Sequence, residues 1–343
     1  NINSVEPLTI DGELIADSLI ADPSVAGINE TITIQGYVTN SGRTSISGDV
    51  EIRDGIDILE SIFISSLNEL DTTAFSAVVG PFASGVHELD ADFVVSGDQD
   101  TTNNLSSVSF GVRYPEGIIT LNEFLPYPES GAAEFVELVY HGDELLSLAG
   151  WGIADQLASP ALFGNVIILN QNYIVVSGDS SLFQQTPDTS LFLTPLSSFP
   201  VLNNSGDVIR LYDPFNTLID SLTYSSNWEY GRGQSMEKIF TDLISADSAS
   251  WLPAAATSGS TPGSRNSVMP WPMDGAIDFA HISYSPIVPS QTDSIQLTIP
   301  VINAGQNALS GYIYIEYNEE ELASVEVSIT TPGDTVLSTL TIP

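Results

Sequence analysis

The sequence predicts an all-β protein of three tandem β-sandwiches, the last of them incomplete. Apolar and polar residues alternate along many short stretches, as at Ile32, Ile34 and Val38, which is the period of a half-buried strand. No stretch places its apolar residues at the spacing of a substantial helix. The chain has 343 residues, which is too long for one sandwich of about 100 residues.

The two ends of the chain carry an internal duplication. Residues 294–315 repeat residues 31–52 at a constant offset of 263, so that Asn303 matches Asn40 and Gly305 matches Gly42. In both copies, alternating apolar residues lead into an Asn-x-Gly turn and a second alternating stretch. Such a repeat predicts two copies of one structural unit.

The second copy of this unit is shorter than the first. Its last residue, Pro343, corresponds to residue 80, so nothing matches residues 81–113. In the first copy we expect that stretch to form the last two strands, near 86–95 and 105–113. The third sandwich is therefore predicted to lack two strands.

The predicted boundaries follow from these patterns. The three sandwiches are placed at 11–114, 117–268 and 275–343, after a short N-terminal strand at 1–10. The start of that strand, Asn1–Val5, resembles Asn104–Val108, the beginning of a closing strand. We interpret residues 1–10 as the end of an upstream module or as a donor strand.

The central block contains a series of short motifs in a fixed order. They are Ile119–Phe124, Glu134–Leu138, Leu148–Asp155, Tyr173–Val176, Leu202–Asp213, Ile219–Tyr224, Gly233–Glu237, Trp251 and Thr261–Asn266. This order resembles the lamin tail domain, an immunoglobulin-like β-sandwich of nuclear lamins and many secreted bacterial proteins. One departure is Lys238, the only lysine in the chain, where that family usually has an arginine.

We expect structural roles for the residues that stand out in this block. Sandwiches bury large aromatic rings, and turn glycines supply a positive φ. The rings are Trp151 and Trp251, and the turn glycines are Gly150, Gly206 and Gly263. For Glu123 and Glu137 the alternative is a role as ligand or acid, but we favour strand-edge carboxylates paired with backbone or arginine.

The repeated unit has its own family resemblance. Its features are the turn Val38–Gly42, the strand start Gly85–Leu89 and the closing loop Asp98–Asn104. The unit is similar to the bacterial cell-adhesion-related domain, CARDB, another immunoglobulin-like sandwich. The two resemblances together imply three tandem immunoglobulin-like sandwiches.

Composition limits the partners and the location. The chain has 44 acidic and 7 basic residues, a net charge of −37, so it repels nucleic-acid phosphates. The charge is more typical of a protein that works in salty water, or of one that binds calcium or a cationic surface. Cysteine is absent, and no run of about 20 apolar residues predicts membrane insertion. We expect a secreted protein whose signal peptide, if the gene encodes one, has been removed.

No catalytic constellation is visible. His87, His141 and His281 fall in three different modules without metal-ligand spacing, and Ser235 has no neighbouring histidine to activate it. The sequence also has no phosphate-binding glycine loop. We therefore predict no catalytic or cofactor-binding residues and no enzymatic activity.

One loop offers oxygen ligands to a hard cation. Asp98, Asp100 and Asn103 lie within a short polar loop, and calcium prefers such ligands. The loop lacks the spacing of an EF-hand, so a solvated turn is the competing interpretation. Calcium at these three residues is a prediction, and no other cofactor is expected.

Two classes of function remain open. The first is a non-catalytic structural or adhesive segment of a bacterial surface or filament protein, with the modules as spacers and binding faces. The second is an accessory region of a secreted hydrolase, such as a nuclease or phosphatase, which lamin tail domains often accompany. Further β-modules beside this segment favour the first class, and a hydrolase domain favours the second.

The incomplete third sandwich predicts a partner. A module without two strands leaves a sheet edge open, and extended segments complete such edges by strand addition. The added segment comes either from further residues of a longer protein or from the N-terminal strand, Ile2–Ile10, of a neighbouring copy. The second source would build a head-to-tail filament.

Overall fold

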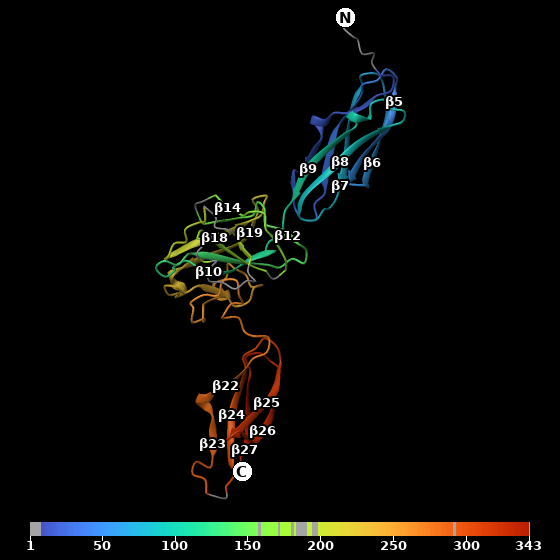
Figure 1. The fold of residues 1–343 in the computed structure, drawn as a ribbon. Helices are drawn as coiled ribbons and strands as arrows, with labels where there is room; N and C mark the ends of the chain where they lie inside the picture. Colours follow the sequence, from blue (N-terminus) through green and yellow to red (C-terminus); the bar gives the residue numbers. More distant parts are fainter. Residues whose placement is uncertain are drawn as a thin grey trace.

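The computed structural model describes residues 8–156, 159–170, 172–179, 182, 191–193, 198–290 and 293–342. Three β-rich units follow one another from the N-terminal to the C-terminal end (Figure 1). The helical turns in these ranges are 3-10 turns of three residues, so the all-β prediction is confirmed. No helix in the same ranges is long and apolar enough to cross a membrane.

The first module is a sandwich of two sheets. Its strands are β1 (Gly12–Leu14), β2 (Ile20–Asp22), β3 (Val25–Ala26), β4 (Ile32–Asn40), β5 (Ile46–Asp54), β6 (Asp57–Leu67), β7 (Thr72–Val79), β8 (Gly85–Val95) and β9 (Leu105–Val112). One sheet has the order β1-β4-β2 with β7 on the other side of β4, and the second has the order β3-β9-β8-β5-β6. The alternating residues Ile32, Ile34 and Val38 are fully buried in the core.

The central domain also stacks two main sheets. Its strands are β10 (Ile119–Leu125), β11 (Phe135–Tyr140), β12 (Leu146–Ser147), β13 (Gly152–Ala154), β14 (Ala161–Leu162), β15 (Ile167–Ile168), β16 (Tyr173–Ser177), β17 (Leu191–Leu193), β18 (Gly206–Tyr212), β19 (Leu218–Ser225), β20 (Met236–Lys238) and β21 (Trp251–Pro253). The larger sheet has the order β17-β16-β11-β10-β20-β21, the smaller β14-β13-β18-β19, and β12 pairs with β15.

The core of the central domain lies between these sheets and is rich in aromatic rings. Trp151 is fully buried and Trp251 is 3% exposed, and the Trp251 indole N–H donates to the Ser245 carbonyl at 2.9 Å. The rings of Phe124 and Tyr224 lie 4.9 Å apart in the same cluster. The predicted core role of both tryptophans is therefore confirmed. The predicted turn glycines all have positive φ: Gly150 (80°), Gly206 (139°) and Gly263 (74°).

The third module repeats part of the first. Its strands are β22 (Gly275–Ile277), β23 (Ser283–Ser285), β24 (Ile295–Asn303), β25 (Leu309–Tyr317), β26 (Glu320–Ile329) and β27 (Thr335–Ile342). One sheet has the order β22-β24-β23 with β27 beside β24, like its counterpart in the first module. The second sheet consists of β25 and β26 in the described residues, where the first module adds β8, β9 and β3.

The duplication extends to individual hydrogen bonds. The Asn40 side chain donates to the Thr44 carbonyl at 2.9 Å and accepts from the Gly42 N–H at 3.0 Å. The Asn303 side chain donates to the Asn307 carbonyl at 2.9 Å and accepts from the backbone N–H two residues on at 3.1 Å. Both asparagines are fully buried. The repeated turn is therefore the same turn in both modules, which justifies comparing them residue by residue.

The N-terminal segment enters the first module as the interdomain linker enters the third. The Arg43 N–H donates to the Leu8 carbonyl at 3.1 Å, and its counterpart, the Gln306 N–H, donates to the Trp271 carbonyl at 2.9 Å. Residues 8–10 thus lie against the first module. The first seven residues of the predicted strand at 1–10 lie outside the described ranges.

Candidate functional site

The central domain buries three glutamates side by side on adjacent strands. Glu137 of β11 and Glu237 of β20 both pair in register with Glu123 of β10. Each side chain is 0% exposed. We call these three residues the carboxylate clasp. A buried carboxylate is costly unless it is hydrogen-bonded, so the partners of the clasp decide what it does.

The clasp faces away from the sandwich core. Phe124, Val136 and Met236, which neighbour the glutamates along their strands, belong to the core cluster. Because side chains alternate along a strand, the glutamates project from the opposite face of the sheet. A register shift between Leu121 and Glu123 sets this alternation on β10.

The residues that cover the clasp come from residues 259–268, which we call the closing segment. Glu237 accepts from the Thr261 hydroxyl at 2.8 Å, the Ser267 hydroxyl at 2.7 Å and the Val268 N–H at 3.0 Å. Glu123 accepts from the Thr261 N–H at 2.8 Å. The clasp therefore fastens the end of the domain to its central strands.

The remaining contacts complete the attachment. Glu123 also accepts from the Ser235 hydroxyl at 2.6 Å, and Glu137 accepts from the Asn122 side chain at 2.7 Å and from the backbone N–H of Gly263. Asn266, fully buried, donates to the Lys238 carbonyl at 2.8 Å. The glutamates are thus held by backbone, hydroxyl and amide groups. The predicted pairing with backbone is confirmed. These partners include no arginine, and β10 and β11 are central strands, not sheet edges.

Burial raises the pKa values of Glu123 and Glu137. It raises the pKa of Glu123 to about 7. It also raises the pKa of Glu137 well above its ordinary value, with the charge of Glu123 as the next cause. Paired carboxyls with raised pKa values suit acid–base catalysis when a substrate reaches them. Here all three are sealed from solvent, so their role is structural.

A second polar cluster surrounds Lys238, on the next position of β20. Burial lowers the pKa of Lys238 to about 8, against the charges of Asp220 and Asp242, which raise it. Its ammonium group lies 3.4 Å from the Thr241 carbonyl and 5.7 Å from the centre of the Trp251 ring. The only lysine in the chain therefore acts as an internal cation beside two aspartates.

A cavity of about 420 Å3 adjoins this cluster and is lined by Thr120, His141, Asp220 and Asp242 among others. The Thr120 hydroxyl donates to the Thr241 carbonyl at 2.9 Å, so it cannot also give its proton to His141 Nε2, 2.9 Å away. Burial, followed by the charge of Lys238, lowers the pKa of His141. Asp220 already accepts from the Leu121 N–H at 2.7 Å. The cavity thus brings together groups that are far apart in sequence, but it holds no activated nucleophile.

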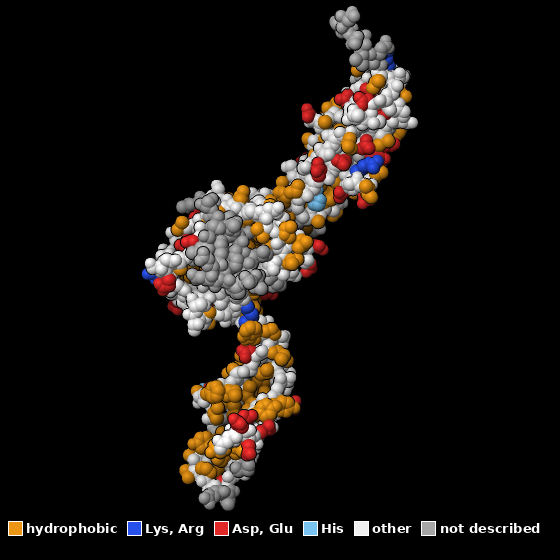
Figure 2. Space-filling view, in the orientation of Figure 1, with side chains coloured by type: hydrophobic (Ala, Val, Ile, Leu, Met, Phe, Trp, Pro, Cys, Tyr) orange, Lys and Arg blue, Asp and Glu red, His pale blue; other side chains and the backbone are white. Residues whose placement is uncertain are grey.

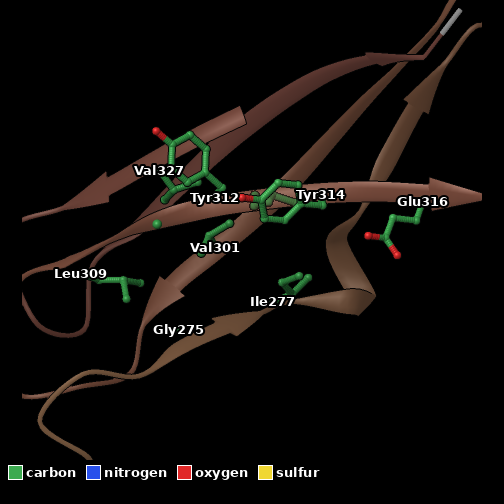
Figure 3. Close-up of a pocket in the computed structure, with 10 residues that line it drawn as sticks. Gly275, Ile277, Val301, Leu309, Tyr312, Tyr314, Glu316 and Val327 are labelled. Carbon is green, nitrogen blue, oxygen red and sulfur yellow. The ribbon is translucent and has the colours of Figure 1, made fainter. Parts of the chain in front are cut away.

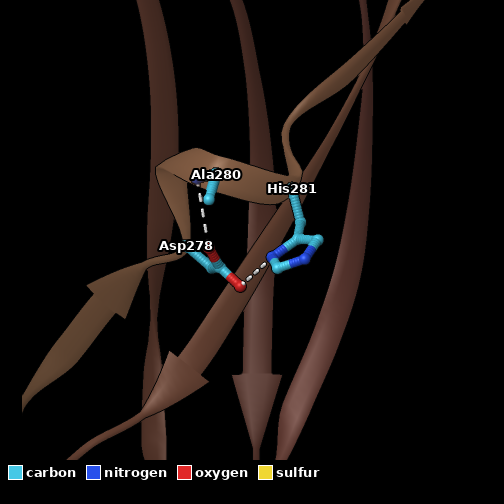
Figure 4. Close-up of polar contacts among 3 residues, drawn as sticks. All are labelled: Asp278, Ala280 and His281. Atoms are coloured by element: carbon cyan, nitrogen blue, oxygen red, sulfur yellow. Dashed lines mark hydrogen bonds and ion pairs between the residues drawn. The ribbon is translucent and has the colours of Figure 1, made fainter.

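The other two histidines have local structural partners. Asp278 accepts from the Ala280 N–H at 3.1 Å and pairs with His281 Nδ1 at 2.6 Å, which caps a 3-10 turn at the surface (Figure 4). His87 stacks on Phe110 with ring centres 5.4 Å apart. Neither arrangement contains a reacting group.

The predicted calcium loop is closed by its own hydrogen bonds. Asp98 accepts from the Gly12 N–H at 2.9 Å and from the Asp100 N–H at 3.0 Å. Asp100 accepts from the Thr102 hydroxyl at 2.6 Å. The two aspartates therefore order the loop and fasten it to the first strand of the module.

A further aspartate joins this loop, one that sequence reasoning missed. The Asn103 amide donates to Asp11 at 3.2 Å, while the Asn103 side-chain oxygen is buried without a hydrogen-bond partner. Burial, then the charges of Asp98 and Asp100, raise the pKa of Asp11. Among the described residues, no group of three or more His, Cys, Asp or Glu side chains has the arrangement of a metal site. Calcium at Asp98, Asp100 and Asn103 stays a prediction.

Calcium binding at this loop has a direct test. We expect millimolar calcium to raise the melting temperature of the first module, because a ligand that binds only the folded state stabilises it. The rise should be smaller in Asp100→Ala. Calorimetry with and without EDTA measures both, and an equal rise in the two proteins would remove the loop as the site.

Comparison with known proteins identifies the central domain. Residues 113–226 match the Lamin Tail Domain family. This confirms the resemblance that the order of motifs predicted. The clasp strands β10 and β11 fall inside the matched part, whereas β20 and the closing segment lie beyond it. In this lamin tail domain, Lys238 occupies the position after the Ser-x-Glu motif as an internal cation, next to the clasp residue Glu237.

Solved structures include two similar proteins. The CARDB domain of a Pyrococcus furiosus protein, in complex with di-metal ions, has 19% identity over 30% of this chain and 94% of its own, with a TM-score of 0.25. A DUF4876 family protein from Bacteroides thetaiotaomicron has 11% identity over 62% of this chain and 85% of its own, with a TM-score of 0.26. No curated protein matches the chain.

Proposed function

We propose that this chain is a non-catalytic structural and adhesive segment of a bacterial surface protein, in which the modules act as spacers and binding faces. The lamin tail domain and the immunoglobulin-like modules around it are binding or structural domains. The observation that carries the proposal is the packed joint between the first module and the lamin tail domain. A spacer has to hold its modules in a fixed direction, and apolar packing at a joint restricts the relative motion that is otherwise the default between domains.

The first joint places an aromatic ring against a glycine. The Phe215 ring, on the β18–β19 turn, packs so closely on Gly111 of β9 that a Cβ atom there would lie 2.3 Å from it. The Tyr114 N–H donates to Asp213 of the same turn at 3.3 Å. The Tyr114 ring lies 4.9 Å from the buried Trp151. The turn therefore contacts both the last strand of the first module and the connecting residues.

The second joint is built from the linker that follows the lamin tail domain. The Arg265 guanidinium lies 4.0 Å from the centre of the Trp271 ring, a cation–π contact. Arg265 also donates to the Met269 carbonyl. The Gln306 side chain donates to the Pro270 carbonyl. The linker thus contacts the lamin tail domain on one side and the third module on the other, which supports an array of modules held in a fixed direction (Figure 1).

The joint predicts a rigid inter-module distance. The chain has no cysteine, so Ile56→Cys and Ile244→Cys, at positions that are 92% and 73% exposed, accept spin labels selectively. We expect double electron–electron resonance to give a narrow distribution of the distance between the two labels, and a broader distribution after Phe215→Ala. Phe63→Ala, at an exposed position of the first module away from the joint, is the control. Equal widths with and without the Phe215 ring would refute the spacer role.

The charge of the chain argues against nucleic acid as a partner. With 44 acidic against 7 basic residues, the segment attracts cationic surfaces and repels nucleic acid. We infer that its partners are other protein modules or copies of itself, and that the segment works outside the cell.

A non-catalytic role predicts no turnover. We expect the purified chain to hydrolyse neither phosphoesters nor glycosides, because the polar groups at its cavities are already engaged in internal hydrogen bonds. Steady-state assays with chromogenic substrates provide the measurement. Turnover that disappears with the single substitution His141→Ala would contradict this role and would point to the cavity beside Lys238.

A further inference from the structure

The cavity of about 420 Å3 in the lamin tail domain combines apolar walls with carboxylates. Its lining comes from β10, from β19, from the end of β11 and from the loop between β20 and β21. The apolar and acidic residues of the lining are Ile219, Leu243, Ile244, Glu116, Asp220 and Asp242. Cavities with apolar walls and a few convergent polar groups are where proteins commonly bind ligands.

One wall of this cavity is held in place from inside the domain. The wall is formed by residues 241–245, which we call the wall loop. The Lys238 ammonium donates to the Thr241 carbonyl at 3.4 Å, and the Trp251 indole N–H donates to the Ser245 carbonyl at 2.9 Å. Both donors are buried. The wall loop is therefore fixed before a ligand arrives, and a preformed site loses less conformational entropy on binding.

Asp220 has one acceptor position left for a ligand. It accepts from the N–H groups of Leu121 and Ser221 and from the Ser245 hydroxyl, at distances from 2.5 to 2.8 Å. An ionised carboxylate offers about four acceptor positions. These three hydrogen bonds orient the Asp220 carboxylate, and the remaining position can accept from a donor that enters the cavity.

The charge around the cavity favours a cation. Glu116 and Asp242 are exposed and form its rim. Burial, followed by the charge of Lys238, lowers the pKa of His141, so this lining residue adds no positive charge near pH 7. Lys238 offsets one of the three carboxylates, which leaves an excess of negative charge. Figure 2 shows the same imbalance, with many acidic and few basic side chains on the face that it presents.

A cavity in the third module has a different lining. It has a volume of about 470 Å3 and is lined by Ile277, Val301, Tyr312 and Glu316 among others (Figure 3). Glu316 is the one carboxylate among its described lining residues. Three carboxylates beside apolar walls thus distinguish the cavity of the lamin tail domain from this one.

We propose that the cavity of the lamin tail domain binds a lysine side chain of a partner protein. The apolar stem of that lysine lies against Ile219 and Leu243, and its ammonium group reaches the carboxylates. An ammonium group donates in three directions from one point, which suits carboxylates from separate segments. A guanidinium group is a flat fork that fits a single carboxylate best.

The lysine comes from a different protein. Lys238 is the only lysine in these 343 residues and is 0% exposed, so another copy of this segment cannot supply it. The inference rests on the proposed adhesive role, because it names the chemistry of one binding face. It does not depend on the packed joint between the first module and the lamin tail domain.

The three histidines of the chain allow a direct test. Nα-acetyl-lysine methylamide is titrated into the full chain at constant pH, and the imidazole resonances are followed by nuclear magnetic resonance. His141 lines the cavity, whereas His87 and His281 lie in the other two modules. We expect a saturable shift at His141 alone. The norleucine analogue, which has the stem without the charge, should cause no shift.

Two double variants separate the cavity from the general charge of the chain. Glu116→Gln combined with Asp242→Asn should weaken binding of the lysine probe by about fivefold, as expected for two partly screened charge pairs. Glu144→Gln combined with Glu229→Gln removes two exposed charges of the same domain outside the cavity lining. This control should bind the probe like the unmodified chain.

Four results would overturn the proposal. They are the absence of a saturable shift at His141, equal weakening in both double variants, tighter binding of Nα-acetyl-arginine methylamide, and displacement of the lysine probe by calcium chloride. The distance distribution between spin labels tests the spacer role without any ligand. The lysine site and the spacer role can therefore fail separately.

Discussion

Replacing Glu237 with alanine should lower the free energy of unfolding of the lamin tail domain by about 3 to 5 kcal/mol, since each buried donor left without an acceptor costs about 1–3 kcal/mol. The affected donors are the Thr261 hydroxyl, the Ser267 hydroxyl and the Val268 N–H. The Thr261 hydroxyl still has Glu123 at 3.2 Å, whereas the Ser267 hydroxyl and the Val268 N–H lose the Glu237 acceptor. Water cannot easily replace that acceptor at a site where Glu237 is 0% exposed.

Urea unfolding followed by tryptophan fluorescence measures this loss, because Trp151, Trp228 and Trp251 all lie in the central domain. Glu144→Ala, at an exposed glutamate of the same domain, is the matched control and should change little. Glu237→Gln keeps one acceptor oxygen, so its free energy of unfolding should fall between those of Glu237→Ala and Glu144→Ala. A Glu237→Ala protein as stable as Glu144→Ala would show that the clasp does not hold the closing segment.

The lamin tail domain should become more stable as the pH falls from 8 to 5. Burial raises the pKa of Glu123 to about 7 in the folded state, while the unfolded carboxyl titrates near its ordinary value of about 4.3. The folded state then binds more protons over this range, so the stabilisation is complete below the unfolded pKa and is lost as the pH rises through the folded one. The expected span is about 3 kcal/mol.

Glu123→Gln isolates this effect from the general repulsion among acidic side chains. The variant stays neutral, so we expect it to exceed the wild-type protein in stability at pH 8 and to match it at pH 5. Unfolding curves at several pH values provide the measurement. If the two proteins have parallel pH profiles, Glu123 does not control the pH dependence of the domain.

The repeated modules could be predicted from sequence because their signals are local. Asn40 and Asn303 lie in identical short turns. The alternating apolar residues around them become buried once a neighbouring strand pairs beside them. Local patterns of this kind fix the type of element and its order along the chain.

The carboxylate clasp could not be derived in the same way. Its glutamates are separated by up to 114 positions in sequence, from Glu123 to Glu237, and an acidic residue in an alternating strand normally faces solvent. A faint signal was present in Val136-Glu137-Leu138, where a charge lies between two buried apolar residues. Only the path of the closing segment, which is long-range, shows that the face carrying Glu137 is covered.

The position of the closing segment has a mechanical consequence. Val268, the last residue held by the clasp, is followed directly by the linker to the third module. A pull applied through that module therefore reaches Glu237 and its neighbours before it reaches the aromatic core. Under tension the lamin tail domain would first release its final residues, so the strength of three buried carboxylates sets the force at which this domain begins to extend.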